Sequence, residues 1–139
     1  MTTVADTGDG ATFGIGATTA GPFTAIGEVT NISLPDEATD AVEATHLGSA
    51  GRREFIVGLS DPGEVSIEFN FTATGYAALK TKSDARAAFA FEVEEPNGDT
   101  WGAACILTSL KAGDLAAGEV TKGSATFKVS GPLTYTEAA

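Results

Sequence analysis

The sequence predicts a mainly β protein: an antiparallel β-sandwich or barrel-like core with one flanking α-helix. Three observations support this prediction. Apolar and polar residues alternate strictly over residues 65–72, directly after the turn signal DPG at residues 61–63. A second alternation, over residues 87–95, ends at the hairpin signal PNGD at residues 96–99. Helical periodicity is clear at one place, residues 74–86.

The first 24 residues are predicted to form an N-terminal arm, extended or partly ordered, ahead of a single β domain over residues 25–139. Gly, Thr and Ala dominate this segment, in which Phe13, Ile15 and Phe23 are the large apolar residues. One short strand is expected over residues 11–17. A frayed terminus and an arm that docks on a neighbouring subunit remain two open interpretations.

Residues 25–34 predict a strand with a bulge near Gly27, because the apolar pattern slips at that point. Pro35 ends this strand. A short strand is expected over residues 41–47, and a polar loop follows it. The short apolar run of residues 55–59 then leads into the turn before the alternating strand.

The helix predicted at residues 74–86 has Thr74 as its candidate N-cap and Tyr76 and Leu79 on one face. Its basic residues lie towards the C-terminal end, where the helix dipole favours them: Lys80, Lys82 and Arg86. At roughly three turns, the helix needs a sheet to pack on.

The last strands differ in character. Residues 100–110 are apolar on both faces, which predicts a central or interface strand. The final strand, residues 119–130, breaks its alternation at Gly123, so a second bulge is expected there. The dipeptide at residues 131–132, Gly-Pro, ends that strand.

The composition fits one acidic domain with a thin core. The chain has 139 residues and a formal net charge of −11. Arg52 and Arg53 are its one pair of adjacent basic residues. Such a surface repels phosphate, so the sequence argues against a protein that grips nucleic acid.

The single cysteine, Cys105, excludes an intrachain disulfide, and nothing implies an oxidising compartment. The acidic N-terminus lacks the apolar segment of a secretory signal, and no run has the apolar length that spans a bilayer. The expectation is a cytoplasmic chain without membrane anchoring.

No catalytic constellation can be assembled from the sequence. His46 is the only histidine, which excludes histidine-rich metal sites. Cys105 lies in an apolar strand, where a buried inert thiol is the better interpretation, and Glu92 with Glu94 fits a solvated strand face. The sequence therefore predicts a protein that is not an enzyme, with no cofactor and no metal site. A hydrolase built on Cys105 or on acid pairs is the least favoured alternative.

The order of these signals resembles a known family. The strand IGEVTNI at residues 26–32 is followed by Leu-Pro, an acidic segment over residues 41–47, and a Gly-rich loop with basic residues over residues 48–53. The run GLSDPGEVSIEF then covers residues 58–69. This order, together with the size and the acidity, is similar to that of the major tail tube proteins of long non-contractile-tailed phages and of phage-derived gene transfer agents. The resemblance extends over residues 24–130.

The resemblance implies a structural subunit that forms hexameric rings, which stack into a tube with an acidic lumen for DNA. It implies self-association and three further partners: the tape-measure protein, the tail terminator and distal tail proteins. It places the protein in the tail of a virion or gene-transfer-agent particle, after assembly in the host cytoplasm.

Two sets of residues are assigned by position from the resemblance. The loop that reaches the adjacent ring is assigned to Gly48, Ser49, Gly51, Arg52 and Arg53. The candidates for the lumen wall are Glu64, Glu68, Glu92 and Glu94. A non-enzymatic binding module, adhesin-like or capsid-decorating, remains the alternative; it predicts a stable monomer or trimer with a discrete ligand surface, which no aromatic cluster in the sequence marks.

Overall fold

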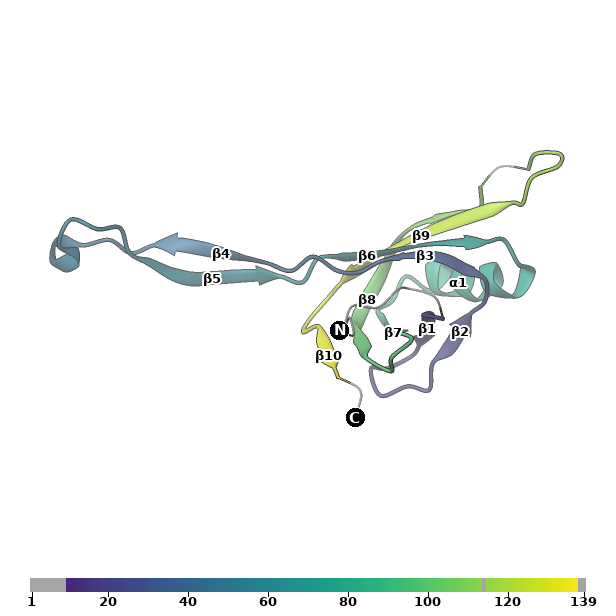
Figure 1. The fold of residues 1–139 in the computed structure, drawn as a ribbon, viewed down its shortest axis with the longest axis horizontal. Helices are drawn as coiled ribbons and strands as arrows, with labels where there is room; N and C mark the ends of the chain where they lie inside the picture. The colour runs from purple at the N-terminus through teal and green to yellow at the C-terminus, as the bar shows by residue number, and fades with distance from the viewer. Residues whose placement is uncertain (1–9, 114, 138–139) are drawn as a thin grey trace, which may run out of the picture.

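The computed structural model describes residues 10–113 and 115–137, which form a curled sheet, one α-helix and a long projecting hairpin (Figure 1). The sheet has the order β2-β1-β7-β8-β9-β6-β3, with β10 also paired to β8, and every pairing is antiparallel. The mainly β prediction with one α-helix is therefore confirmed. The bounds are β1 (Thr12–Gly16), β2 (Thr24–Ile26), β3 (Val29–Ser33), β4 (Ala38–Glu43), η1 (Leu47–Ser49), β5 (Phe55–Asp61), β6 (Glu64–Asn70), α1 (Ala73–Ala85), β7 (Phe89–Glu94), β8 (Thr100–Lys111), β9 (Lys122–Val129) and β10 (Thr134–Thr136).

The sheet curls because its two end strands are neighbours in the sequence. β2 and β3 stand at opposite ends of the strand order, yet only Gly27 and Glu28 join them. Glu28 adopts a left-handed conformation with φ of 57°, which turns the chain sharply. The bulge predicted near Gly27 is therefore wrong at that position: the chain makes a turn there, and the register shift lies further on, between Val29 and Asn31.

The inner face of the curled sheet and one side of α1 enclose the core. Phe13, Phe91 and Phe127 come from three different strands and are completely buried. The ring centroid of Phe13 lies 5.9 Å from that of Phe91 and 5.2 Å from that of Phe127. Leu79 of α1 is also fully buried in this cluster. Because aromatic side chains are large, these stacked rings fill the barrel-like interior although the core contains few large residues.

The strand predicted inside the N-terminal arm is part of the main sheet. β1 lies between β2 and β7, and its Phe13 and Ile15 are core residues. The chain from Gly10 onward is thus packed on the β domain that was predicted to begin at residue 25. Residues 1–9, the rest of the predicted arm, lie outside the described residues.

Two local predictions are wrong for identifiable reasons. The cap of α1 is Thr72, not Thr74: the Thr72 hydroxyl accepts a hydrogen bond from the Gly75 amide at 3.1 Å. No bulge occurs at Gly123, which pairs with Phe69 in an unbroken ladder. A Cβ at Gly123 would lie 2.8 Å from the Phe69 ring, so the glycine makes room for an aromatic side chain.

The central position of β8 is confirmed, since this strand pairs with β7, β9 and β10. The hairpin predicted before it is also confirmed. The Glu95 amide donates to the Asp99 carbonyl at 2.8 Å, and the Gly98 amide donates to the Glu95 carbonyl at 2.9 Å. A bulge between Leu107 and Ser109 lets the long strand bend towards β9.

A matched pair of substitutions tests whether β1 contributes to the core. Phe13→Ala is expected to lower the free energy of unfolding by about 3–5 kcal/mol, because it leaves a cavity among stacked rings. Phe55→Ala, at a position that is 56% exposed, is expected to change that free energy by less than about 0.5 kcal/mol. Urea unfolding of both variants measures the difference, and equal losses would contradict the placement of β1.

Candidate assembly surfaces

The most prominent surface feature is a hairpin, β4–η1–β5, that projects far from the body (Figure 1). We call residues 38–61 the hairpin arm. The arm continues the register of the β3–β6 pair: Ser33 pairs with Ser66, Ala38 pairs with Asp61, and four residues separate these pairs on each strand. The arm is therefore an extension of one two-stranded ribbon, not an irregular loop.

The base of the arm is where this ribbon leaves the sheet. β5 and β6 run nearly in line and pair with different strands, so the DPG motif redirects the chain without forming a hairpin (Figure 1). Gly63 has φ of 88°, and a Cβ there would lie 2.6 Å from the Asp36 carbonyl oxygen. The two chain segments thus cross in close contact at a point that requires glycine.

One charged side chain ties the arm base to the sheet. The Asp61 carboxylate accepts hydrogen bonds from Lys128 Nζ at 2.8 Å and from the Gly63 amide at 2.9 Å. These two bonds, that of Lys128 above all, hold the pKa of Asp61 below its ordinary value. Lys128 lies on β9, so the contact links Asp61, the last residue of the arm, to a strand inside the sheet.

The shaft of the arm exposes large apolar side chains. Every residue of β4 is exposed, and in β5 Gly58 alone is partly covered. The exposed fractions reach 82% at Val57 and 84% at Leu59. Large apolar side chains gathered in water on one projecting element indicate an interaction site.

The tip of the arm is ordered by its own hydrogen bonds. Ser49, which is buried, donates through Oγ to Glu54 Oε2 at 2.6 Å and accepts from the His46 amide at 3.0 Å. His46 Nε2 lies 3.2 Å from the same Glu54 oxygen, and His46 Nδ1 accepts from the Gly48 amide at 3.0 Å. The chain's one histidine therefore helps to shape the tip.

The five residues predicted to reach the adjacent ring all lie at this tip. Gly48 and Ser49 belong to η1 and hold its shape; a Cβ at Gly48 would lie 2.9 Å from the His46 ring. Gly51, Arg52 and Arg53 follow and are exposed. Within the described part of the chain, neither arginine is in an ion pair. The structure brings these residues together, while their contact with another ring stays a prediction.

The four lumen candidates lie on the sheet face away from the core, in two separate pairs. Glu64 and Glu68 alternate with buried residues on β6, and Glu92 and Glu94 do so on β7. β9 and β8 stand between those strands. The sequence reasoning missed the lysines in this gap: Lys111 at the end of β8, and Lys122 and Lys128 on β9, where the polar even positions could have revealed them.

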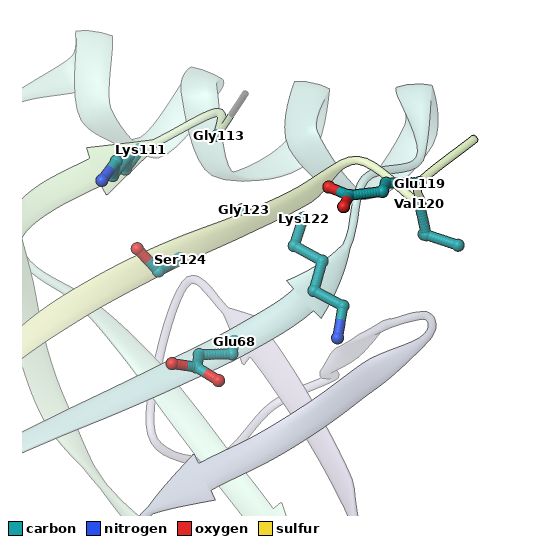
Figure 2. A pocket seen from close by; sticks show the side chains of 8 residues that line it. All are labelled: Glu68, Lys111, Gly113, Glu119, Val120, Lys122, Gly123 and Ser124. Atoms are coloured by element: carbon teal, nitrogen blue, oxygen red, sulfur yellow. The ribbon is translucent and has the colours of Figure 1, made fainter. Parts of the chain in front are cut away.

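A shallow pocket on that outer face shows how mixed its charge is (Figure 2). It has a volume of about 360 Å³ at the base of the β8–β9 hairpin. Glu68 and Glu119 line it together with Lys111 and Lys122. Ligand pockets for small molecules are largely apolar with a few placed polar groups, whereas four of the eight residues that line this hollow are charged.

The groups considered for catalysis do not form a site. Cys105 is completely buried, and burial raises the pKa of its thiol to about 12, so the reactive thiolate does not form at neutral pH. In the described ranges, no three side chains of His, Cys, Asp or Glu gather as metal ligands. None of the described helices combines the length and the apolar character needed to cross a membrane.

Comparison with known proteins identifies the family. The model for the lambda-like phage tail tube proteins (TTP) matches residues 5–128. The chain belongs to this family. It is a tail tube subunit, a structural component of the particle tail, as the order of sequence signals implied. A search of the curated proteins found no match.

Solved structures of tail assemblies share the fold over nearly the whole chain. The tail of an empty gene transfer agent particle is 19% identical, with a TM-score of 0.73 over 96% of this chain and 100% of that one. The sheath/tube terminator of an extracellular contractile injection system, PVC, is 12% identical, with a TM-score of 0.76 over 99% and 100%. The SPP1 tail tube is 11% identical, with a TM-score of 0.65 over 92% and 77%. At these identities the likeness establishes the fold alone.

The close crossing at the arm base of this tail tube subunit predicts a cost for any side chain at Gly63. Gly63→Ala is expected to lower the free energy of unfolding by about 1–3 kcal/mol, because it combines positive φ with a backbone clash. Gly27→Ala is the matched control, since nothing lies within 4 Å of a Cβ there. Chemical denaturation compares the two, and a silent Gly63→Ala would contradict the crossing.

The Asp61–Lys128 contact predicts a pH dependence. Because the folded-state pKa of Asp61 is lowered, the contact stabilises the fold above the unfolded-state pKa and loses that effect as pH falls through the folded-state value. Lys128→Met should therefore raise the Asp61 pKa towards its ordinary value. An NMR titration of the Asp61 carboxyl measures this, and an unchanged midpoint in the variant would show that Lys128 does not hold the carboxylate.

Proposed function

We propose that this tail tube subunit forms stacked hexameric rings, in which the hairpin arm joins one ring to the next and acidic side chains line a conduit for DNA. The observation that carries the proposal is the arm itself. It exposes apolar side chains along its whole shaft and holds an ordered basic tip far from the body. A single copy leaves this surface in water, so assembly is what gives it a partner.

The sheet edges support a closed ring. β2 and β3 end the strand order and each pairs on one side with another described strand. Exposed edges are templates for pairing with further chains, and a head-to-tail contact between copies closes into a ring when its rotation allows. The gene transfer agent tail that shares this fold has C6 symmetry, which supports six copies for this chain.

The charge supports a conduit that does not hold DNA. With a net charge of −11, the tube wall would repel phosphate, so DNA would slide through without specific contacts. Glu64, Glu68, Glu92 and Glu94 face away from the core and remain the candidates for the wall. Two of the lysines between these pairs, Lys111 and Lys122, would be available for contacts to neighbouring copies within the same ring.

The further partners follow from the ring architecture. Structures of the sheath/tube terminator and of the baseplate of contractile injection systems contain chains that share this fold. Rings of similar shape can stack through the same surfaces, so we propose that the ends of the tube meet the tail terminator and the distal tail proteins. The tape-measure protein would occupy the lumen before DNA does.

Charge reversal at the tip tests the proposal. In Arg52→Glu with Arg53→Glu, tube yield is expected to fall about tenfold or more, because like charges across an interface cost several kcal/mol. The free energy of unfolding should change by less than about 0.5 kcal/mol, since both side chains are exposed. Negative-stain electron microscopy and sedimentation measure the yield.

A matched control separates the tip from charge in general. Lys80→Glu with Lys82→Glu makes the same change of net charge on α1, away from the arm, and should leave more tube than the tip variant. Wild-type protein that stays monomeric or trimeric at high concentration would overturn the proposal and favour a binding module.

A further inference from the structure

The histidine at the arm tip is held through both of its ring nitrogens. His46 is the N-cap of η1, and its Nδ1 accepts a hydrogen bond from the Gly48 amide at 3.0 Å. On the other side of the ring, Nε2 lies 3.2 Å from Glu54 Oε2. A ring nitrogen that accepts a hydrogen bond carries no proton, so the proton of the neutral ring is on Nε2 and is donated to Glu54. The contacts therefore select one neutral tautomer of His46.

The same carboxylate closes the tip on itself. Ser49 donates through Oγ to Glu54 Oε2 at 2.6 Å and accepts from the His46 amide at 3.0 Å. Directly after η1, Ala50 and Gly51 both have positive φ, 55° and 79°. A non-glycine residue is strained in this conformation and keeps it only where its surroundings hold it there. The bonds of His46 and Glu54 form such surroundings.

A second proton on the His46 ring is incompatible with this arrangement. It would bind to Nδ1 through the lone pair that accepts from the Gly48 amide, which leaves two N–H donors facing each other. The Nε2 contact offsets little of this loss, because the side chains of His46 and Glu54 are 65% and 52% exposed and ion pairs in water are weak. Histidine ordinarily changes its charge between about pH 5 and pH 8, so the conflict arises in mild acid.

The charges around the ring come from both sides of the hairpin. In the described ranges, the ionic contact of the ring is with Glu54, which directly precedes β5. The other charged residues of segment 43–55 are Glu43, at the end of β4, and Arg52 and Arg53, which follow η1. Protonation of Glu54 would also weaken the tip, so a test has to separate this carboxyl group from the histidine.

We propose that His46 is a pH-sensitive switch for the arm tip. While the ring is neutral, Nδ1 holds the Gly48 amide and η1 keeps its shape. When Nδ1 binds a proton from solvent, this hydrogen bond is lost and the turn that carries Arg52 and Arg53 opens. The consequence for assembly rests on the proposed function: a tip that joins rings at neutral pH would join them less readily in mild acid.

NMR of the unassembled subunit tests the switch without the tube. In ¹⁵N-labelled protein, an N–H···N hydrogen bond gives a scalar coupling between its two nitrogens, and the nitrogen shifts of the ring report its protonation. The coupling between the Gly48 amide and His46 Nδ1 should be present at about pH 8 and should disappear as the ring titrates. Absence of the coupling at the higher pH, or Gly48 and Arg52 amide resonances that stay constant while the ring titrates, would overturn the switch.

The matched variant is His46→Asn, because asparagine is a preferred N-cap whose Oδ1 can accept from the Gly48 amide without titrating. This variant should keep the amide resonances of Gly48, Arg52 and Arg53 constant between about pH 8 and pH 5. His46→Ala, which has no cap, should show the open tip at every pH. If the His46→Asn tip still opens in this range, Glu54 is the group responsible and the proposal fails.

Tube yield gives a second measurement. The wild-type yield is expected to fall about fivefold or more between about pH 7.5 and pH 5.5, the effect of one lost N-cap bond, and the His46→Asn yield less than about twofold. Equal losses in the two proteins would overturn the link between the switch and assembly. Protein that forms no tubes at any pH would overturn the proposed function instead, and the NMR titration would still decide the switch.

Discussion

One ribbon of two antiparallel strands connects the folding of this protein to its assembly. β3 and β6 form one end of the sheet, and the same register continues through β4 and β5 into the hairpin arm. The sheet anchors the ribbon because β6 also pairs with β9 along its whole length. Gly63 and Asp61 hold the crossing where the ribbon leaves the body. The direction of the arm is thus determined by the sheet, so assembly begins from a preformed geometry and pays less conformational entropy.

The body needs few large residues because the sheet curls on itself. Stacked rings of Phe13, Phe91 and Phe127 fill the interior, and Leu79 closes it from the helix side. The arm does the opposite with its apolar residues: instead of burying them, it leaves them in water on both faces of the shaft. In the proposed assembly, this tail tube subunit would divide its hydrophobic surface between a core made at folding and an interface made between copies.

The sequence predicted the elements whose pattern depends on local physics. Strict alternation located β6 and β7, the PNGD motif located the β7–β8 hairpin, and helical spacing located α1. Features that depend on distant chain segments were missed. The positive φ at Gly63 favours glycine in any kind of turn. The motif does not form a hairpin here because β5 and β6 pair with different strands, which the local sequence does not reveal. Residues 55–59 are apolar whether their cover comes from this chain or from another, so their exposure could not be predicted.

The candidate site residues also divide into those whose arrangement follows from the local sequence and those whose arrangement depends on distant chain segments. The five tip residues lie together because they are nearly adjacent in the sequence, and their contact with another ring stays a prediction. The four glutamates fall into two pairs because β8 and β9 separate their strands. The central claim, that the arm joins stacked rings, is tested most directly by a cryo-EM reconstruction of tubes assembled from purified protein. In tubes joined by the arms, every arm is expected to cross from its own ring into the next and to be covered there. Arms that lie along the outside of their own ring, with the apolar shaft in solvent, would contradict it.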